Sequence, residues 1–107
     1  MKRVGFVLKV KREKIEEYKE HHKHVWPEML RALERTGWHY YSLYMRDDGT
    51  LFGYFETPES LDAARAAMAQ EEVNARWQAF MSPYFEAPEG APPDQMMQEL
   101  EEVFHLD

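Results

Sequence analysis

Residues 16–29, EEYKEHHKHVWPEM, contain the two side chains of this chain that are best suited to acid–base chemistry. Tyr18 and His22 are four residues apart inside an apolar repeat of helical spacing, so a helix would place them on one face with their Cβ atoms ~6 Å apart. A phenol and an imidazole held together on an inward face make an acid–base pair or a polar clamp for a ligand. The same spacing also fits an ordinary amphipathic helix, in which Tyr18 packs and His22 finds a hydrogen bond.

A cluster of three histidines, HHxH, invites a metal-binding interpretation. On a helix His21 and His24 could share a face, whereas His22 points about 100° away from His21. The sequence has no HExxH motif, and a carboxylate ligand would have to come from another element. We therefore predict no metal site, and we expect His21 and His24 to be solvated.

Other chemical motifs are missing from the sequence, which has no GxGxxG or GxxxxGK[ST] phosphate loop and no GxSxG serine elbow. Its aromatic residues instead favour a sugar pocket. Tyr41 on a predicted strand and Trp77 on a predicted helix would add rings on which the apolar face of a sugar stacks, while hydroxyl groups find hydrogen bonds. Plain core packing of Tyr41 and Trp77 is the alternative.

The composition of the 107 residues is that of one globular domain, predicted to span residues 1–107. A net charge of −7 and the lack of a basic block argue against nucleic acid and against an anionic membrane surface. No apolar run approaches the ~20 residues of a membrane-spanning helix, and Lys9 and Lys11 interrupt the apolar opening, so it does not read as a secretory signal. The chain has no cysteine, which excludes thiolate chemistry and fits the predicted cytoplasmic location.

The periodicity of apolar residues predicts the elements that position these side chains. Pro27 lies inside a helical pattern and cannot donate a hydrogen bond, so we expect a kink or break near 23–27. Thr57 followed by Pro58 reads as a helix cap. The predicted elements are a strand over 3–10, a helix over 12–36, strands over 38–45 and 50–56 around a turn at 47–49, helices over 58–69 and 71–85, a loop over 87–94 and a closing strand over 99–106.

The resulting order β-α-β-β-α-β predicts an α+β, ferredoxin-like fold with helices on one face of an antiparallel sheet. The strand over 50–56 has apolar residues on both faces, Leu51 and Phe55 on one and Phe52 and Tyr54 on the other. Helices can cover only one face, and a large exposed apolar patch is unusual on a monomer. We therefore expect a two-fold homodimer, which would make the fold a dimeric α+β barrel.

Several segments together resemble L-rhamnose mutarotases, which are small dimeric α+β enzymes that interconvert the α and β anomers of L-rhamnose. The combination EEY-x3-H-x3-WPE with a terminal VFHLD is the specific part of this resemblance. The segments that carry it run along nearly the whole chain and are RVGFVLKV, EEYKEHHKHVWPEM, HYYSLYM, LFGYFE, ARWQAFM and LEEVFHLD.

The resemblance implies that His22 is the acid–base residue, acting as proton donor, and that Tyr18 and Tyr41 bind the sugar. Trp77 would also contact the sugar, and where related enzymes carry a second tryptophan this chain has Gln78, which replaces a stacking surface by an amide. Mutarotation takes the proton of the anomeric hydroxyl, protonates the ring oxygen, and then recloses the ring. It needs no metal or organic cofactor, so we expect none.

Two other functions share this architecture or this pocket. A small oxygenase of the dimeric α+β barrel type often has a pocket histidine and would turn over haem or a quinol. A non-catalytic sugar-binding module would use the aromatic pocket without needing His22. The fold alone does not separate these possibilities. The combined motifs favour a mutarotase that acts on L-rhamnose, with L-fucose or another deoxy sugar as other possible substrates.

Overall fold

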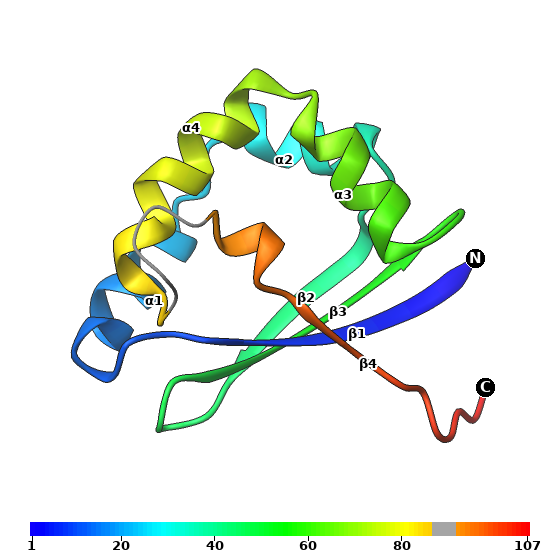
Figure 1. Cartoon of the computed structure of the whole chain (residues 1–107), viewed down its shortest axis with the longest axis horizontal. Coiled ribbons are helices and arrows are strands. Elements are labelled where there is room, and N and C mark those ends of the chain that lie inside the picture. The colour runs from blue at the N-terminus through cyan, green and yellow to red at the C-terminus, as the bar shows by residue number, and fades with distance from the viewer. Residues whose placement is uncertain (87–91) are drawn as a thin grey trace.

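An antiparallel sheet lies beneath an arch of helices, and the other face of the sheet has no helical cover (Figure 1). This computed structural model describes residues 1–86 and 92–107. Within them the sheet has four strands in the order β2-β3-β1-β4. The elements are β1 (Lys2–Lys9), η1 (Arg12–Lys14), α1 (Ile15–His22), α2 (Pro27–Arg35), β2 (His39–Met45), β3 (Thr50–Thr57), α3 (Leu61–Ala69), α4 (Glu72–Met81), the 3₁₀ turns η2 (Ser82–Tyr84) and η3 (Pro93–Gln95), and β4 (Gln98–Leu100).

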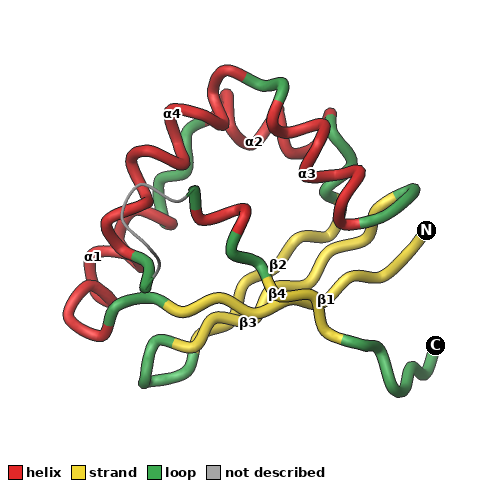
Figure 2. The backbone as a smooth tube through the Cα atoms, in the orientation of Figure 1, coloured by secondary structure: helices red, strands yellow, loops and turns green. Residues whose placement is uncertain are grey.

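The layers follow from the alternation of apolar residues along the strands. Phe6 of β1 and Phe55 of β3 are fully buried beneath the helices, with their ring centroids 6.2 Å apart. The register pairs Phe6 with Gly53, and a side chain at Gly53 would collide with the Phe6 ring, so this strand needs a glycine there. Figure 2 shows the separation into one helical layer and one sheet layer. The predicted α+β class, with helices on one face of an antiparallel sheet, is confirmed.

Pro27 divides the first helical segment as predicted. The helix predicted over 12–36 is observed as η1, α1 and α2, with residues 23–26 outside regular helix. Pro27 is the first residue of α2, where its missing N–H leaves no helical hydrogen bond unmade. His22 is consequently the last residue of α1, so the end of a helix presents the imidazole.

The predicted cap at Thr57 is wrong. Thr57 is the last residue of β3, where it is buried and pairs with Lys2 of β1. The helix α3 begins three residues later than predicted, at Leu61, and Ser60 is its cap, because the Ser60 hydroxyl accepts a hydrogen bond from the Ala63 N–H at 3.0 Å. Pairing in the sheet therefore takes precedence over the local capping signal.

The second helical segment ends earlier than the prediction of 71–85. The helix α4 stops at Met81, and the chain tightens into η2. Pro83 lies in that turn and cannot donate the hydrogen bond that would continue an α-helix. Of the loop predicted over 87–94, residues 87–91 lie outside the described residues, and Pro93 and Asp94 belong to η3.

The closing strand predicted over 99–106 is also wrong in extent. The strand β4 covers only Gln98–Leu100 and pairs with the middle of β1. Residues 101–107 have no regular structure, and Glu102 instead binds the Arg3 side chain with two hydrogen bonds of 2.7 and 2.8 Å. The glutamates of this segment favour a solvated position over a place in the sheet. No helix in the described part of the chain is long and apolar enough to cross a membrane.

Candidate active site

His22 lies at the end of α1 with its ring between two aromatic side chains. The Tyr18 ring stacks on it from the preceding turn, with centroids 4.1 Å apart, and the Trp77 ring of α4 meets it edge-on at 5.6 Å. The Nδ1 atom of His22 is 3.0 Å from the backbone carbonyl oxygen of Tyr18. A carbonyl can only accept, so Nδ1 carries the proton, and the neutral ring keeps its lone pair on Nε2.

The surroundings of His22 also favour its neutral form. Burial lowers its pKa below the ordinary value of ~6.5, the hydrogen bond to the Tyr18 carbonyl opposes this effect, and the neighbouring His21 adds to it. At neutral pH the imidazole is therefore uncharged and ready to accept a proton at Nε2. It becomes a proton donor once it has taken up that proton.

The other two histidines of the cluster differ from each other. His24 is exposed as predicted, with Nε2 3.7 Å from a Glu20 carboxylate oxygen. The prediction that His21 is solvated is wrong, because its Nε2 lies 2.9 Å from the Tyr84 hydroxyl and its ring meets Phe80 edge-on at 4.8 Å. The last turn of α1 is thus fastened to α4 and η2. Among the described residues, no three His, Cys, Asp or Glu side chains are placed to hold a metal ion.

Tyr18, His22 and Tyr41 line one cavity of about 630 Å³, a volume in the range of small-molecule sites. They come from α1 and β2, so two layers of the fold meet at this cavity. The rest of the cavity lining is mainly aliphatic and includes two lysines, one in α1 and one directly after it. These other residues are Lys19, Lys23, Val25, Leu30, Leu33, Leu43, Tyr44, Met45 and Leu51.

The two phenols of the cavity remain protonated. Burial is the main cause that raises the pKa of Tyr18, and burial together with the charge of Asp94 raises the pKa of Tyr41. Neither hydroxyl is hydrogen-bonded to a residue in the described part of the chain. Because buried hydroxyl groups are normally paired, the two phenols offer hydrogen bonds to whatever occupies the cavity.

Trp77 and Gln78 are adjacent in sequence, but their side chains contact different residues on different sides of α4. Trp77 is buried, and its ring contacts His22 and also Trp26, whose centroid is 4.9 Å away. It therefore lies behind the imidazole and does not line the cavity of Tyr18 and Tyr41 directly.

Gln78 faces away from His22 and uses both ends of its amide. Its Nε2 donates to Asn74 Oδ1 at 3.0 Å, and its Oε1 accepts from the backbone N–H of Asp94 at 3.0 Å. These three residues border a second cavity of about 500 Å³. The structure thus brings Tyr18, His22 and Tyr41 together, with Trp77 in contact, and places Gln78 apart from them.

Sequence reasoning missed Asn74 and Asp94. Both are buried, with 5% and 8% of their surface exposed. Asn74 lies among the inward residues Val73, Trp77 and Met81 of α4, and a polar residue in such a row is a detectable signal of a buried hydrogen bond. No comparable signal marks Asp94, which comes after a proline-rich segment.

Together the fold and the site define a small α+β domain in which a neutral histidine base and two protonated phenols line one cavity with mainly aliphatic walls. Such a set of residues is typical of an acid–base enzyme that binds a small ligand rich in hydroxyl groups.

The profile of the L-rhamnose mutarotase family matches residues 3–106. L-rhamnose mutarotases of Bacillus subtilis and Oceanobacillus iheyensis are 37% and 35% identical to this chain, over the whole length of both proteins. The crystal structure of L-rhamnose mutarotase from Formosa agariphila matches with a TM-score of 0.80 at 27% identity, covering all of both chains. The chain belongs to the L-rhamnose mutarotase family. It is an isomerase acting on carbohydrate anomers, which confirms the predicted family and enzyme class.

Proposed function

We propose that this chain interconverts the α and β anomers of L-rhamnose, that His22 is its acid–base residue, and that residues 1–107 act as one mutarotase domain. One observation supports this most strongly. A single cavity is lined by an imidazole with a free Nε2 lone pair and by two protonated phenols without a hydrogen-bond partner among the described residues. The choice of sugar rests on the names of the relatives, each an L-rhamnose mutarotase.

In the proposed mechanism, Nε2 of neutral His22 takes the proton of the anomeric hydroxyl. The bond between the anomeric carbon and the ring oxygen breaks, the imidazolium of His22 gives this proton to the ring oxygen, and an open-chain aldehyde forms beside the neutral imidazole. Rotation about the adjacent carbon–carbon bond exposes the other face of the aldehyde. The hydroxyl group then adds to that face and gives its proton back to Nε2 of His22, and the imidazolium transfers this proton to the new anomeric oxygen. Protons and electrons balance over the cycle.

The other site residues bind and orient. Tyr18 and Tyr41 are uncharged at neutral pH, so we assign them hydrogen bonds to oxygens of the sugar, one of them the ring oxygen. Trp77 fixes the plane of the His22 ring by edge-on contact and supplies apolar surface. The sugar contact predicted for Gln78 stays a prediction. Both ends of the Gln78 amide are hydrogen-bonded within the protein, to Asn74 and to Asp94.

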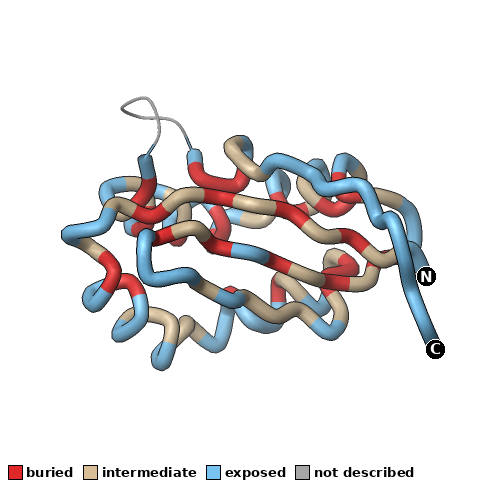
Figure 3. Tube along the Cα trace, turned by 90° about the horizontal axis from the view of Figure 1, so that it is seen from below, coloured by how far each residue is buried: buried red, intermediate tan, exposed pale blue. Residues whose placement is uncertain are grey.

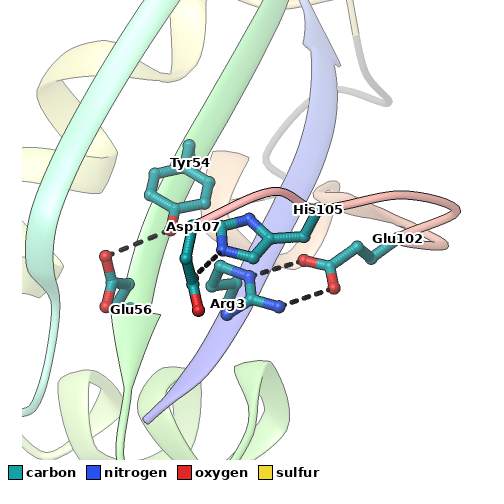
Figure 4. Close-up of polar contacts among 6 residues, drawn as sticks. All are labelled: Arg3, Tyr54, Glu56, Glu102, His105 and Asp107. Atoms are coloured by element: carbon teal, nitrogen blue, oxygen red, sulfur yellow. Dashed lines mark hydrogen bonds and ion pairs between the residues drawn. The ribbon is translucent and has the colours of Figure 1, made fainter.

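The uncovered face of the sheet supports the homodimer that we propose. Phe52 of β3 and Tyr44 of β2 are 39% and 66% exposed on a face without helices, and the C-terminal tail leaves the sheet on that side (Figures 1 and 3). Figure 4 shows polar contacts of β1, β3 and the C-terminal tail, which join Arg3 to Glu102, Tyr54 to Glu56, and His105 to Asp107.

Sedimentation of Phe52→Glu tests the homodimer. A charge on the uncovered face is expected to convert a dimeric wild type into monomers, whereas Ala66→Glu, on the exposed side of α3, leaves the dimer intact. A wild type that sediments as a monomer would contradict the proposal.

We also propose a cytoplasmic location, which the absence of cysteine supports.

Saturation-transfer NMR at anomeric equilibrium tests the proposed activity directly. The exchange rate between the anomers of L-rhamnose is measured with and without the protein, and again with L-fucose and L-mannose. We expect the protein to accelerate exchange most with L-rhamnose. Unchanged exchange with every sugar would contradict a mutarotase function, and faster exchange of another sugar would correct the substrate.

A further inference from the structure

Asp94 is a buried residue that a closed ring of hydrogen bonds holds beside α4. Its Oδ2 accepts from Asn74 Nδ2 at 3.1 Å, and its backbone N–H donates to Gln78 Oε1 at 3.0 Å. Gln78 Nε2 closes the ring by donating to Asn74 Oδ1 at 3.0 Å. Asn74 of α4 therefore holds the carboxylate of Asp94, and Gln78 of the same helix holds its backbone N–H.

The charge of Asp94 is not neutralised by a cation in this ring. Arg65 approaches only the backbone carbonyl oxygen of Asp94, at 3.5 Å, and directs its other nitrogen to Asp62 at 2.6 Å. The second carboxylate oxygen, Oδ1, accepts no hydrogen bond from a residue in the described ranges 1–86 and 92–107. Among the described residues no fully enclosed side-chain oxygen lacks a hydrogen-bond partner, so Oδ1 must be accessible, and it can accept a hydrogen bond from a molecule in the adjoining cavity.

The position of Asp94 connects it to the candidate active site. Its partner Asn74 is three residues before Trp77 on α4, so the two lie on neighbouring parts of one helical face, and Trp77 touches the His22 ring. Tyr41, which lines the cavity of His22, is close enough to Asp94 for the carboxylate to affect the pKa of its phenol. Asp94 itself borders the second cavity of about 500 Å³, and Tyr41 is the side chain that links it to the cavity of His22.

We propose that Asp94 is a second sugar-binding residue, which accepts a hydrogen bond from one sugar hydroxyl through Oδ1, and that Asn74 and Gln78 are its positioning residues. This inference rests on the proposed function. A hydroxyl bonded to a carboxylate makes a short, charge-assisted hydrogen bond, and such a contact selects sugars that carry the hydroxyl at the right carbon.

The variant Asp94→Asn tests the contact, because its side-chain oxygen can still accept from Asn74 while the negative charge is lost. We expect KM for L-rhamnose to rise about tenfold with kcat changed much less, which is the pattern of lost substrate binding. Asp47→Asn, in the exposed turn between β2 and β3, is the matched control and should match the wild type. A folded Asp94→Asn protein with wild-type KM would overturn the proposal.

Monodeoxy analogues of L-rhamnose separate a sugar contact from a purely structural role. For one analogue, the wild type should show a KM about tenfold above that for L-rhamnose, and Asp94→Asn should show nearly equal KM values for the two sugars. If Asp94→Asn instead raises KM for all the sugars by the same factor, the carboxylate acts only through the fold and the proposal is wrong.

Asn74→Ala tests the positioning role. Removing its amide should raise KM several-fold for sugars with the recognised hydroxyl and leave the analogue without that hydroxyl unaffected. An equal effect on both sugars would contradict positioning. These outcomes differ from a failure of the proposed function. In that case the wild type would accelerate anomer exchange of no sugar, and this inference would be wrong as well.

Discussion

On the α1 side of α4, Trp77 meets the His22 ring edge-on, and within residues 1–86 and 92–107 the imidazole makes a single hydrogen bond, to the Tyr18 carbonyl. On the η3 side of the same helix, Asp94 is held by Asn74 and Gln78 in a closed ring of hydrogen bonds. Aromatic rings surround the first group, and side-chain amides surround the second.

The difference fits the roles that we propose for the two groups. An imidazole that exchanges protons works best near its point of half-protonation, with one nitrogen fixed and the other open, and contacts with aromatic rings permit this. A buried carboxylate needs hydrogen-bond donors, and amides provide them without adding charge. The two sides of α4 therefore suit a proton-transfer group and a fixed hydrogen-bond acceptor.

Removing the imidazole is the change with the largest expected effect. His22→Ala should lower the rate of anomer exchange about 10²–10⁴-fold, because correctly placed acid–base catalysis contributes that much. The half-buried position at the end of α1 allows the protein to remain folded. His24→Ala, two residues further and exposed, is the matched control and should keep wild-type exchange by saturation-transfer NMR. Near wild-type exchange in a folded His22→Ala protein would show that His22 is not the acid–base residue.

Removing a single phenol hydroxyl should have a smaller effect. Tyr18→Phe and Tyr41→Phe keep the packed rings and lose one hydrogen bond to the sugar each, so we expect kcat/KM to fall about tenfold in each variant. Tyr40→Phe on the same strand as Tyr41 is the control, because Tyr40 is 75% exposed. If both active-site variants retain full activity, the cavity of Tyr18 and Tyr41 does not bind the sugar.

The smallest expected effect comes from the contact that fastens α1 to η2. Tyr84→Phe removes the hydroxyl that lies 2.9 Å from His21, next to His22 in the chain. We expect about threefold lower kcat/KM with a small loss of stability, because one hydrogen bond between α1 and η2 is lost. Thermal unfolding and exchange kinetics measure both. A large loss of activity at unchanged stability would assign Tyr84 a direct catalytic role.

The contact between Tyr18 and His22 was accessible from the sequence, because both residues belong to one helix and four-residue spacing fixes their relation. The break before Pro27 was accessible for the same reason, since it follows from the covalent structure of one residue. Both features depend only on residues that are close together in the sequence, so they can be predicted from it.

Features that depend on distant pairing were not accessible. Asp94 meets Asn74 across 20 positions of sequence, and His21 meets Tyr84 across 63. The error in the extent of the strand predicted over 99–106 has the same origin, because a segment of suitable composition becomes a strand only where β1 offers it a partner edge. Periodicity shows which face of an element is apolar, and it does not show which element packs against that face.

The central claim is that neutral His22, with its proton on Nδ1, transfers protons at Nε2. Nitrogen-15 NMR of the imidazole as a function of pH, recorded beside the pH profile of kcat/KM for L-rhamnose, tests it most directly. We expect the Nδ1–H tautomer, a His22 pKa below the ordinary ~6.5, and a rate that falls with the same pKa as the solution is acidified, because burial disfavours the charged form. An Nε2–H tautomer, or a rate that does not follow the titration of His22, would contradict the account.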